Sequence, residues 1–140
     1  MWIIFALLAA VSAAFVAIFG KLGLKTIDST LGTTIRSIVM ALFLILTSLL
    51  LGKWKHFTWT SLSSKDWWLI VLAGIAGALS WLFYFFALKN GDATKVAALD
   101  RLSIVFVIIL AAIFLSEGLT WKSLLGATCM AIGAILISLK

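Results

Sequence analysis

The 140-residue sequence is poor in charge, since 11% of its residues are Asp, Glu, Lys or Arg while 64% are hydrophobic. Soluble domains average roughly 45–50% apolar and about 25% charged residues. A water-soluble fold of this size could not bury so much apolar surface. The composition therefore excludes a soluble domain and predicts an all-α protein whose partner is the lipid bilayer.

Reactive side chains are equally scarce. The only cysteine, Cys129, lies in an apolar run, which excludes a disulfide framework and a CxxC metal or redox pair. The only histidine, His56, lies on a different segment, and no HExxH motif is present. We therefore expect no enzyme, no metal site and no cofactor. The basic residues behind the net charge of +6 are scattered between apolar runs, so nucleic-acid binding is not expected either.

What the sequence does contain is a series of long apolar runs. A helix needs about 20 apolar residues to cross roughly 30 Å of hydrocarbon. Because no cationic segment precedes the first run, we interpret it as a retained span and not as a cleaved signal. Short polar loops leave no room for a soluble domain, so residues 1–140 are expected to form one five-span domain. The predicted spans are Trp2–Phe19, about Thr34–Leu51, Trp67–Leu88, about Val96–Leu115 and Trp121–Leu139.

The residues that flank the runs support these edges. Tryptophan prefers the headgroup level of a bilayer. Trp81 lies deep in the third span, whereas the other six tryptophans lie at or near a span end: Trp2, Trp54, Trp59, Trp67, Trp68 and Trp121. Five spans place the termini on opposite sides. The N-terminal side carries four lysines and the other side five, or seven cations with Arg36 and Arg101. The count favours a cytoplasmic C-terminus, and a near-balance also fits a chain that inserts both ways.

Residues 85–139 contain three features in a specific order. They are an "AL..G.A" turn at residues 87–93, the stretch "LSEGLT" at 115–120 and "LLGATCMAIGAILI" at 124–137. In these features the chain resembles the EamA domain of the drug/metabolite transporter superfamily, and the five-span layout extends the resemblance over the whole chain.

That resemblance implies a fold and a function. Full-length members have two five-span repeats of inverted topology, and this chain is one repeat long, as in the short branch of bacterial and archaeal transporters. It implies transport of small metabolites or drugs by alternating access in a prokaryotic plasma (inner) membrane. A lone repeat can restore the inverted symmetry by pairing antiparallel with a second copy, so we expect a homodimer. The small multidrug resistance proteins carry a glutamate in the first span, which here has no ionisable residue.

Asp100 and Arg101 are adjacent and lie near the start of the apolar fourth span. If the helix begins near Thr94, both lie about 9 Å along it. One interpretation is an anchor that reaches the interface, with Asp100 bridging to Arg36 of the second span. The other makes Asp100 a proton or cation site and Arg101 an anion-binding group, because ionisable residues inside a membrane are costly and face the interior by default.

Two further stripes follow helical spacing. Gly74, Gly77, Trp81 and Tyr84 share one face of the third span, where the rings could line a solute cavity or simply pack. On the fifth span, Gly126 and Gly133 lie on one face, and such small residues let membrane helices pack closely, within the chain or in a dimer.

Glu117 follows the fourth span, and the resemblance marks it as a motif position. We expect its carboxylate to accept from the exposed amides at the start of the fifth span.

The sequence thus predicts a transporter of a small-molecule solute whose pathway candidates are Asp100, Arg101, Arg36, Trp81 and Tyr84. The alternative is a non-transporting integral membrane subunit that stabilises a larger complex, with Asp100 and Arg101 paired to a partner chain.

Overall fold

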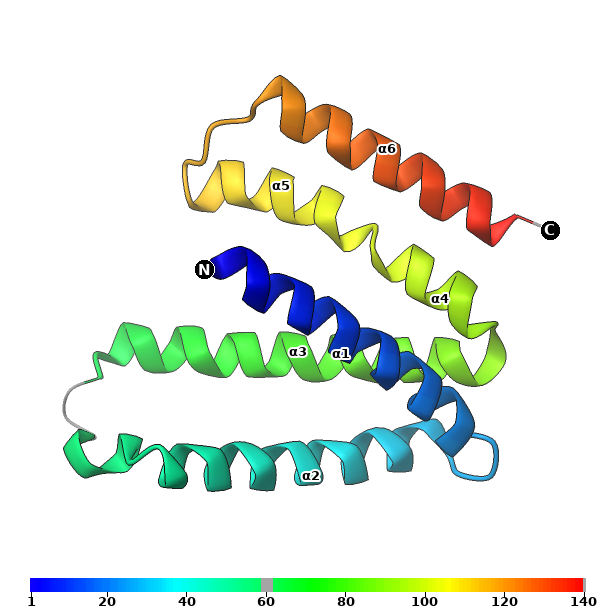
Figure 1. The fold of residues 1–140 in the computed structure, drawn as a ribbon. Coiled ribbons are helices and arrows are strands. Elements are labelled where there is room, and N and C mark those ends of the chain that lie inside the picture. Colours follow the sequence, from blue (N-terminus) through cyan, green and yellow to red (C-terminus); the bar gives the residue numbers. More distant parts are fainter. Residues whose placement is uncertain (59–61, 140) are drawn as a thin grey trace. The chain divides into compact units, whose positions relative to one another are not determined.

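A computed structural model describes residues 1–58 and 62–139, without the side chain of His56, so Trp59 and Lys140 lie outside the described residues. The described residues form helices and no strands, which confirms the all-α prediction. The elements are α1 (Trp2–Gly23), α2 (Ser29–Leu50), the short 3₁₀ helix η1 (Lys53–His56), α3 (Ser64–Asn90), α4 (Ala93–Asp100), α5 (Ser103–Phe114) and α6 (Trp121–Ser138) (Figure 1).

Five of these helical stretches are long and apolar enough to cross a membrane, with residues 93–114 counted as one. The number of predicted spans is therefore confirmed. The predicted start of the second span at Thr34 is wrong, because α2 begins at Ser29. Its N-cap is Asp28, whose Oδ1 accepts hydrogen bonds from the backbone N–H of Thr30 at 2.8 Å and of Leu31 at 3.3 Å. A capping carboxylate satisfies amides that have no partner within the helix.

Side-chain caps also set the starts of α3 and α6. The N–H of Ser63 donates to Oδ2 of Asp66 at 3.0 Å, while the Ser63 hydroxyl accepts from the N–H of Lys65. This exchange resembles a capping box, and it starts α3 at Ser64, before the predicted Trp67. At α6 the hydroxyl of Thr120 accepts from the N–H of Ser123 at 3.1 Å. The expectation that Glu117 caps this helix is wrong, since the closer Thr120 fills that role.

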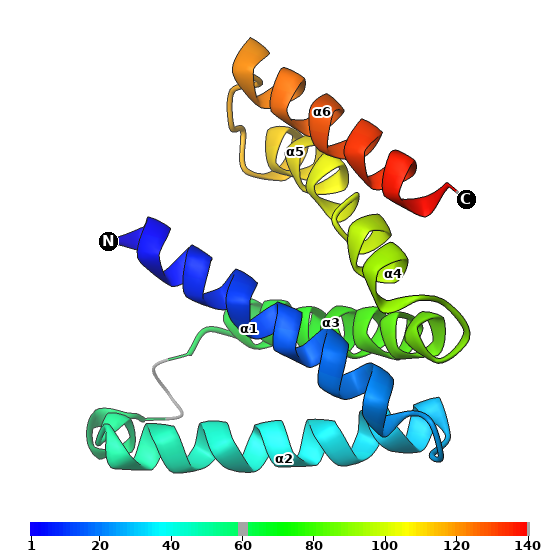
Figure 2. The ribbon, with the colours of Figure 1, turned by 45° about the vertical axis from the view of Figure 1, so that its right-hand side comes forward.

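The chain divides into two compact parts. The hairpin part, residues 23–89, holds α2 and α3, which lie side by side and run antiparallel (Figures 1 and 2). The Lys89 ammonium donates to the carbonyl of Ile27 at 3.1 Å and ties the end of α3 to the segment before α2. The buried residues of this part lie near the same end, where α2 begins and α3 ends: Leu24, Ser29, Thr33, Phe85 and Leu88.

The terminal part comprises residues 1–22 and 90–140. Here α4 and α5 follow one another, and α6 returns alongside them (Figures 1 and 2). Ala127 and Ala134 are the buried positions of α6, and small side chains let helices approach closely. The Lys21 ammonium near the end of α1 donates to the carbonyl of Gly91 at 2.7 Å, which connects α1 to the segment before α4.

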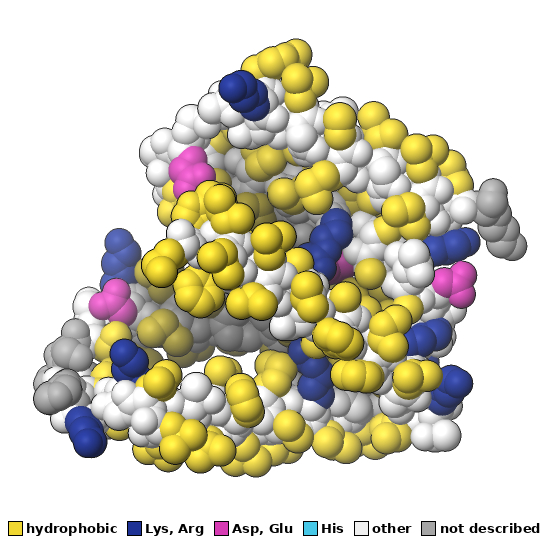
Figure 3. Space-filling view, in the orientation of Figure 1, with side chains coloured by type: hydrophobic (Ala, Val, Ile, Leu, Met, Phe, Trp, Pro, Cys, Tyr) yellow, Lys and Arg dark blue, Asp and Glu magenta, His cyan; other side chains and the backbone are white. Residues whose placement is uncertain are grey.

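Most large hydrophobic side chains are exposed on the isolated chain. Leu42, Phe43 and Leu44 of α2, for example, are each more than 60% accessible. Figure 3 shows hydrophobic side chains along the visible length of α2, with basic side chains near both of its ends. A monomeric soluble protein rarely exposes large apolar patches, so this surface fits a hydrocarbon environment.

Candidate functional site

The hairpin part brings one cation onto an aromatic cluster. Arg36 of α2 places its guanidinium carbon 3.7 Å from the centroid of the Trp81 ring and 5.2 Å from that of Phe85, both on α3. Trp81 meets the rings of Tyr84 and Phe85 in edge-to-face arrangements, with centroids 5.6 and 5.9 Å apart. A cation over an aromatic face is attracted by the negative potential of that face. Arg36 and the three rings therefore form one unit, which we call the Arg36 cluster.

Helical spacing explains why these residues meet. Trp81, Tyr84, Phe85 and Leu88 fall three or four residues apart on α3, so they share one face. Arg36 follows buried Thr33 by three residues on α2 and therefore lies on the face that is turned inward. The packing of the hairpin places these two faces against each other.

Arg36 has no carboxylate partner within the hairpin part. This part contains two acidic residues, Asp28 and Asp66, and each accepts backbone hydrogen bonds at the start of a helix. The hydrogen bonds from the N–H groups of Leu31 and Thr30 lower the pKa of Asp28, because they stabilise its carboxylate as the cap of α2. Nη1 of Arg36 is buried and has no hydrogen-bond partner among the described residues.

The neighbouring hydroxyls of Thr33 and Ser37 are uncharged and donate to backbone carbonyls. Thr33 donates its hydroxyl proton to the carbonyl of Ser29 at 2.7 Å, and Ser37 donates to the carbonyl of Thr33 at 2.8 Å. An unpartnered buried donor is costly, and more so when it carries charge. The Arg36 cluster is thus a cationic site with an unsatisfied donor.

In the terminal part, Asp100 and Arg101 stand at a break in the fourth span. The span predicted over about Val96–Leu115 is present, as residues 93–114, but its α-helical hydrogen bonding is interrupted: α4 ends at Asp100 and α5 begins at Ser103. The N–H groups of Arg101 and Leu102 donate to the carbonyls of Ala98 and Leu99, three residues back instead of four. A stretch of 3₁₀ geometry in the middle of a helix often marks a hinge.

Both charged side chains at this break are exposed on the isolated chain. Asp100 ends α4 and Arg101 is its C-cap, with φ −67° and ψ −11°. They therefore lie within the stretch of residues 93–114 that is apolar enough to span a membrane. Their assignment to a solute pathway stays a prediction.

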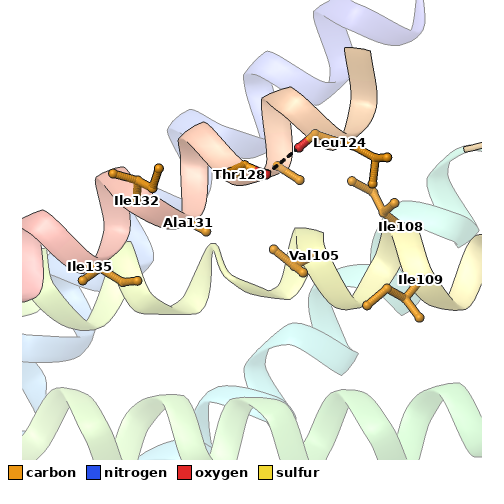
Figure 4. Close-up of a pocket in the computed structure, with 9 residues that line it drawn as sticks. Val105, Ile108, Ile109, Leu124, Thr128, Ala131, Ile132 and Ile135 are labelled. Carbon is orange, nitrogen blue, oxygen red and sulfur yellow. Dashed lines mark hydrogen bonds between the residues drawn. The ribbon is translucent and has the colours of Figure 1, made fainter. Parts of the chain in front are cut away.

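An apolar groove of about 280 Å³ lies between α5 and α6. In Figure 4, Val105, Ile108 and Ile109 from α5 and Leu124 and Ile135 from α6 line the same space. The one hydroxyl on the groove, that of Thr128, donates to the carbonyl of Leu124 at 2.9 Å. The other described lining residues are all apolar, so this groove presents an apolar surface.

The four glycine candidates are not contact points within the described structure. Apart from its chain neighbours and the nearby backbone of its own helix, a Cβ built on Gly74, Gly77, Gly126 or Gly133 would meet no heavy atom of the described residues within 4 Å. At 100° per residue, Gly126 and Gly133 lie on the face of α6 roughly opposite to groove residues such as Ile135. Their role in packing between chains stays a prediction.

The structure therefore unites three of the five predicted pathway residues, namely Arg36, Trp81 and Tyr84, and places Asp100 and Arg101 at the helix break. The sequence analysis missed Phe85, which is buried and joins the cluster. The signal for it was its position four residues after Trp81, on the same helix face. Among the described residues no group of three or more His, Cys, Asp or Glu side chains could hold a metal ion.

Five membrane-spanning stretches, with an arginine and a charged pair inside them, define an integral multi-pass membrane protein. The family model of the EamA-like transporter family matches residues 1–139. The chain belongs to this family of membrane transporters, which confirms the resemblance found in its sequence.

Two relatives carry the same designation. The uncharacterized transporter in the cobO 3'region of Sinorhizobium sp is 39% identical over 137 residues, which cover 98% of this chain and 96% of that protein. The uncharacterized transporter YvbV of Bacillus subtilis (strain 168) is 26% identical over 138 residues, or 99% of this chain and 45% of that protein. No solved structure matches the chain.

Proposed function

We propose that this chain carries small metabolites or drugs across the prokaryotic plasma membrane by alternating access. The observation that carries the proposal is the charged pair Asp100–Arg101 at the interruption of an apolar span. Charged side chains inside a membrane mark solute and ion pathways, and discontinuous helices form the binding sites of many transporters. Family membership supports the same reading.

The working unit in this proposal is an antiparallel homodimer. Residues 1–140 act as one five-span repeat, and a second copy in the opposite orientation supplies the inverted partner that alternating access requires. Two matches support a repeat unit: nearly the whole Sinorhizobium relative and 45% of the Bacillus relative align with this chain. The open glycine face of α6 is the proposed contact between the copies.

Reconstitution of the purified chain alone tests the function. A panel of labelled metabolites is first screened for those that raise the melting temperature of the protein in detergent, since a ligand that binds only the folded state stabilises it. Proteoliposomes that contain no other polypeptide should then take up at least one of these solutes faster than protein-free liposomes. A folded dimer that moves none of its stabilising solutes would instead favour the non-transporting subunit.

A further inference from the structure

The Arg36 cluster holds a positive charge without a counter-charge in its own part of the chain. Arg36 lies seven residues into α2, about 10 Å along the helix at 1.5 Å per residue. An isolated cation within a helix that spans a membrane is costly. The two acids of the hairpin part are committed to helix caps, and Nη1 has no partner among the described residues.

The contact with Trp81 leaves a guanidinium nitrogen of Arg36 without a hydrogen-bond acceptor among the described residues. The guanidinium carbon lies over the Trp81 ring, 3.7 Å from its centroid, and the buried Nη1 has no hydrogen-bond partner among the described residues. A ligand oxygen that accepts a hydrogen bond from Nη1 would remove the cost of this unsatisfied donor. A carboxylate accepts two such bonds in parallel, a match in shape that a halide or a neutral amide does not offer.

The rings around Arg36 favour a particular kind of solute. Trp81 lies edge to face with Tyr84 and with Phe85. Phe85 is buried, whereas Trp81 and Tyr84 are partly exposed and offer aromatic surface beside the cation. Ligand sites commonly combine such a surface with a few polar groups that fix orientation. A small hydrophilic anion would leave this surface unused.

We propose that the Arg36 cluster binds the carboxylate of a solute with a flat apolar body, which lies against the aromatic rings. This proposal rests on the proposed transport function, since the bound molecule would be the transported one. The same oxyanion chemistry could come from an anionic lipid headgroup. A free carboxylate is the better fit because the rings complement a flat body and not a glycerol ester.

A matched pair of probes tests this on the wild-type protein. Benzoate and benzamide share a ring and differ in charge, so purified protein in an uncharged detergent is melted with each at increasing concentration. Benzoate should raise the melting temperature in a dose-dependent way, and benzamide should not. Equal effects of the two probes, or no effect of either, would overturn the proposal. Stabilisation by phosphatidylglycerol in the micelle, but not by benzoate, would overturn it in favour of a lipid site.

Substitutions then locate the binding group. Arg36→Gln should weaken benzoate binding about tenfold or more, because it removes charged hydrogen bonds. Arg36→Lys keeps the charge but loses the planar fork, so its affinity for benzoate should lie between that of the wild type and that of Arg36→Gln. This variant provides the test if the glutamine variant does not fold. Lys25→Gln, which removes an exposed positive charge of the same part, is the control and should bind as the wild type does. Unchanged binding in Arg36→Gln would contradict the assignment.

Binding and transport can fail separately. Arg36-dependent binding of benzoate without flux in liposomes would support this site while contradicting the transport function. Flux of uncharged solutes by a protein that binds neither benzoate nor other carboxylates would leave the transport function standing and overturn this inference alone.

Discussion

Asp28 holds the first turn of α2 through a single carboxylate oxygen, which accepts from two backbone amides. Replacing it by alanine should lower the melting temperature at neutral pH, because those amides lose their acceptor. Asparagine keeps an acceptor and should cost much less. Thermal melts of the detergent-solubilised variants measure both effects. Asp92→Ala is a matched control, since Asp92 precedes α4 without a side-chain cap bond, and it should melt close to the wild type.

The pH dependence of this effect has a definite sign. The hydrogen bonds from Leu31 and Thr30 lower the pKa of Asp28 in the folded protein. A depressed folded pKa gives stability that is present above the unfolded value, about 3.9, and is lost as the pH falls through the folded value. The difference between wild type and Asp28→Ala should therefore be largest at neutral pH and shrink below about pH 4. A difference that grows on acidification would contradict this role.

Individual site residues were predictable from the sequence to different degrees. Arg36 stood out as a cation in an apolar run, and Trp81 as a tryptophan away from a span edge. Their contact was not predictable, because it depends on how α2 and α3 are rotated against each other. The early start of α2 could have been predicted from Asp28, since Asp is a strong N-cap residue directly before a helical pattern.

The break between α4 and α5 is the distinctive feature at the scale of elements. Amides of Arg101, Leu102, Ile104 and Val105 donate to carbonyls three residues back, in a geometry poorer than that of an α-helix. Hydrogen–deuterium exchange of the reconstituted protein should therefore show faster exchange at residues 101–105 than in the middle of α3, residues 71–78. Uniform protection along residues 93–114 would show that the span is continuous and would contradict the hinge.

The sequence predicted this span but not its break, for a physical reason. Residues 96–110 contain no glycine or proline, the usual marks of an interrupted helix. Arg101 and Leu102 also keep helical dihedral angles, with ψ values of −11° and −18°. Only the register of the hydrogen bonds changes. The charged pair Asp100–Arg101 was the one local indication in the sequence that the helix is irregular at this point.

At the scale of the whole molecule, five spans followed directly from hydropathy, because each apolar run must cross the bilayer as a helix. The proposed pairing of two copies does not follow from hydropathy, since apolar helices pack against lipid and protein alike. The glycine face of α6 is the contact surface that we propose for this pairing, and its glycines have open space beside them.

The antiparallel dimer makes a prediction about access from the two sides of the membrane. With Cys129 replaced by alanine, a single cysteine placed near either terminus should be labelled by an impermeant reagent both from outside intact cells and from inside inverted vesicles. The reason is that half of the copies point each way. Labelling from one side throughout would end the antiparallel arrangement, though not the transporter function.

Cross-linking tests the proposed contact between two copies at the glycine face of α6. A single cysteine at Gly133 should form a cross-link between two chains, whereas one at Ile135, on the opposite, groove side of α6, should not. This pair separates the proposed glycine contact from collisions of loosely associated chains, which would cross-link at both positions.

The most direct measurement of the central claim is uptake by proteoliposomes that carry the double variant Asp100→Asn with Arg101→Gln. These changes remove both charges at the helix break and keep polar groups of similar size. Burying one such charge costs about 2.5–3.5 kcal/mol on insertion scales, which a mere anchor does not require. We predict that the variant folds and dimerises like the wild type, as judged by melting temperature and cross-linking, but loses solute uptake. Wild-type uptake by the folded, dimeric double variant would contradict the claim that this pair belongs to the transport pathway.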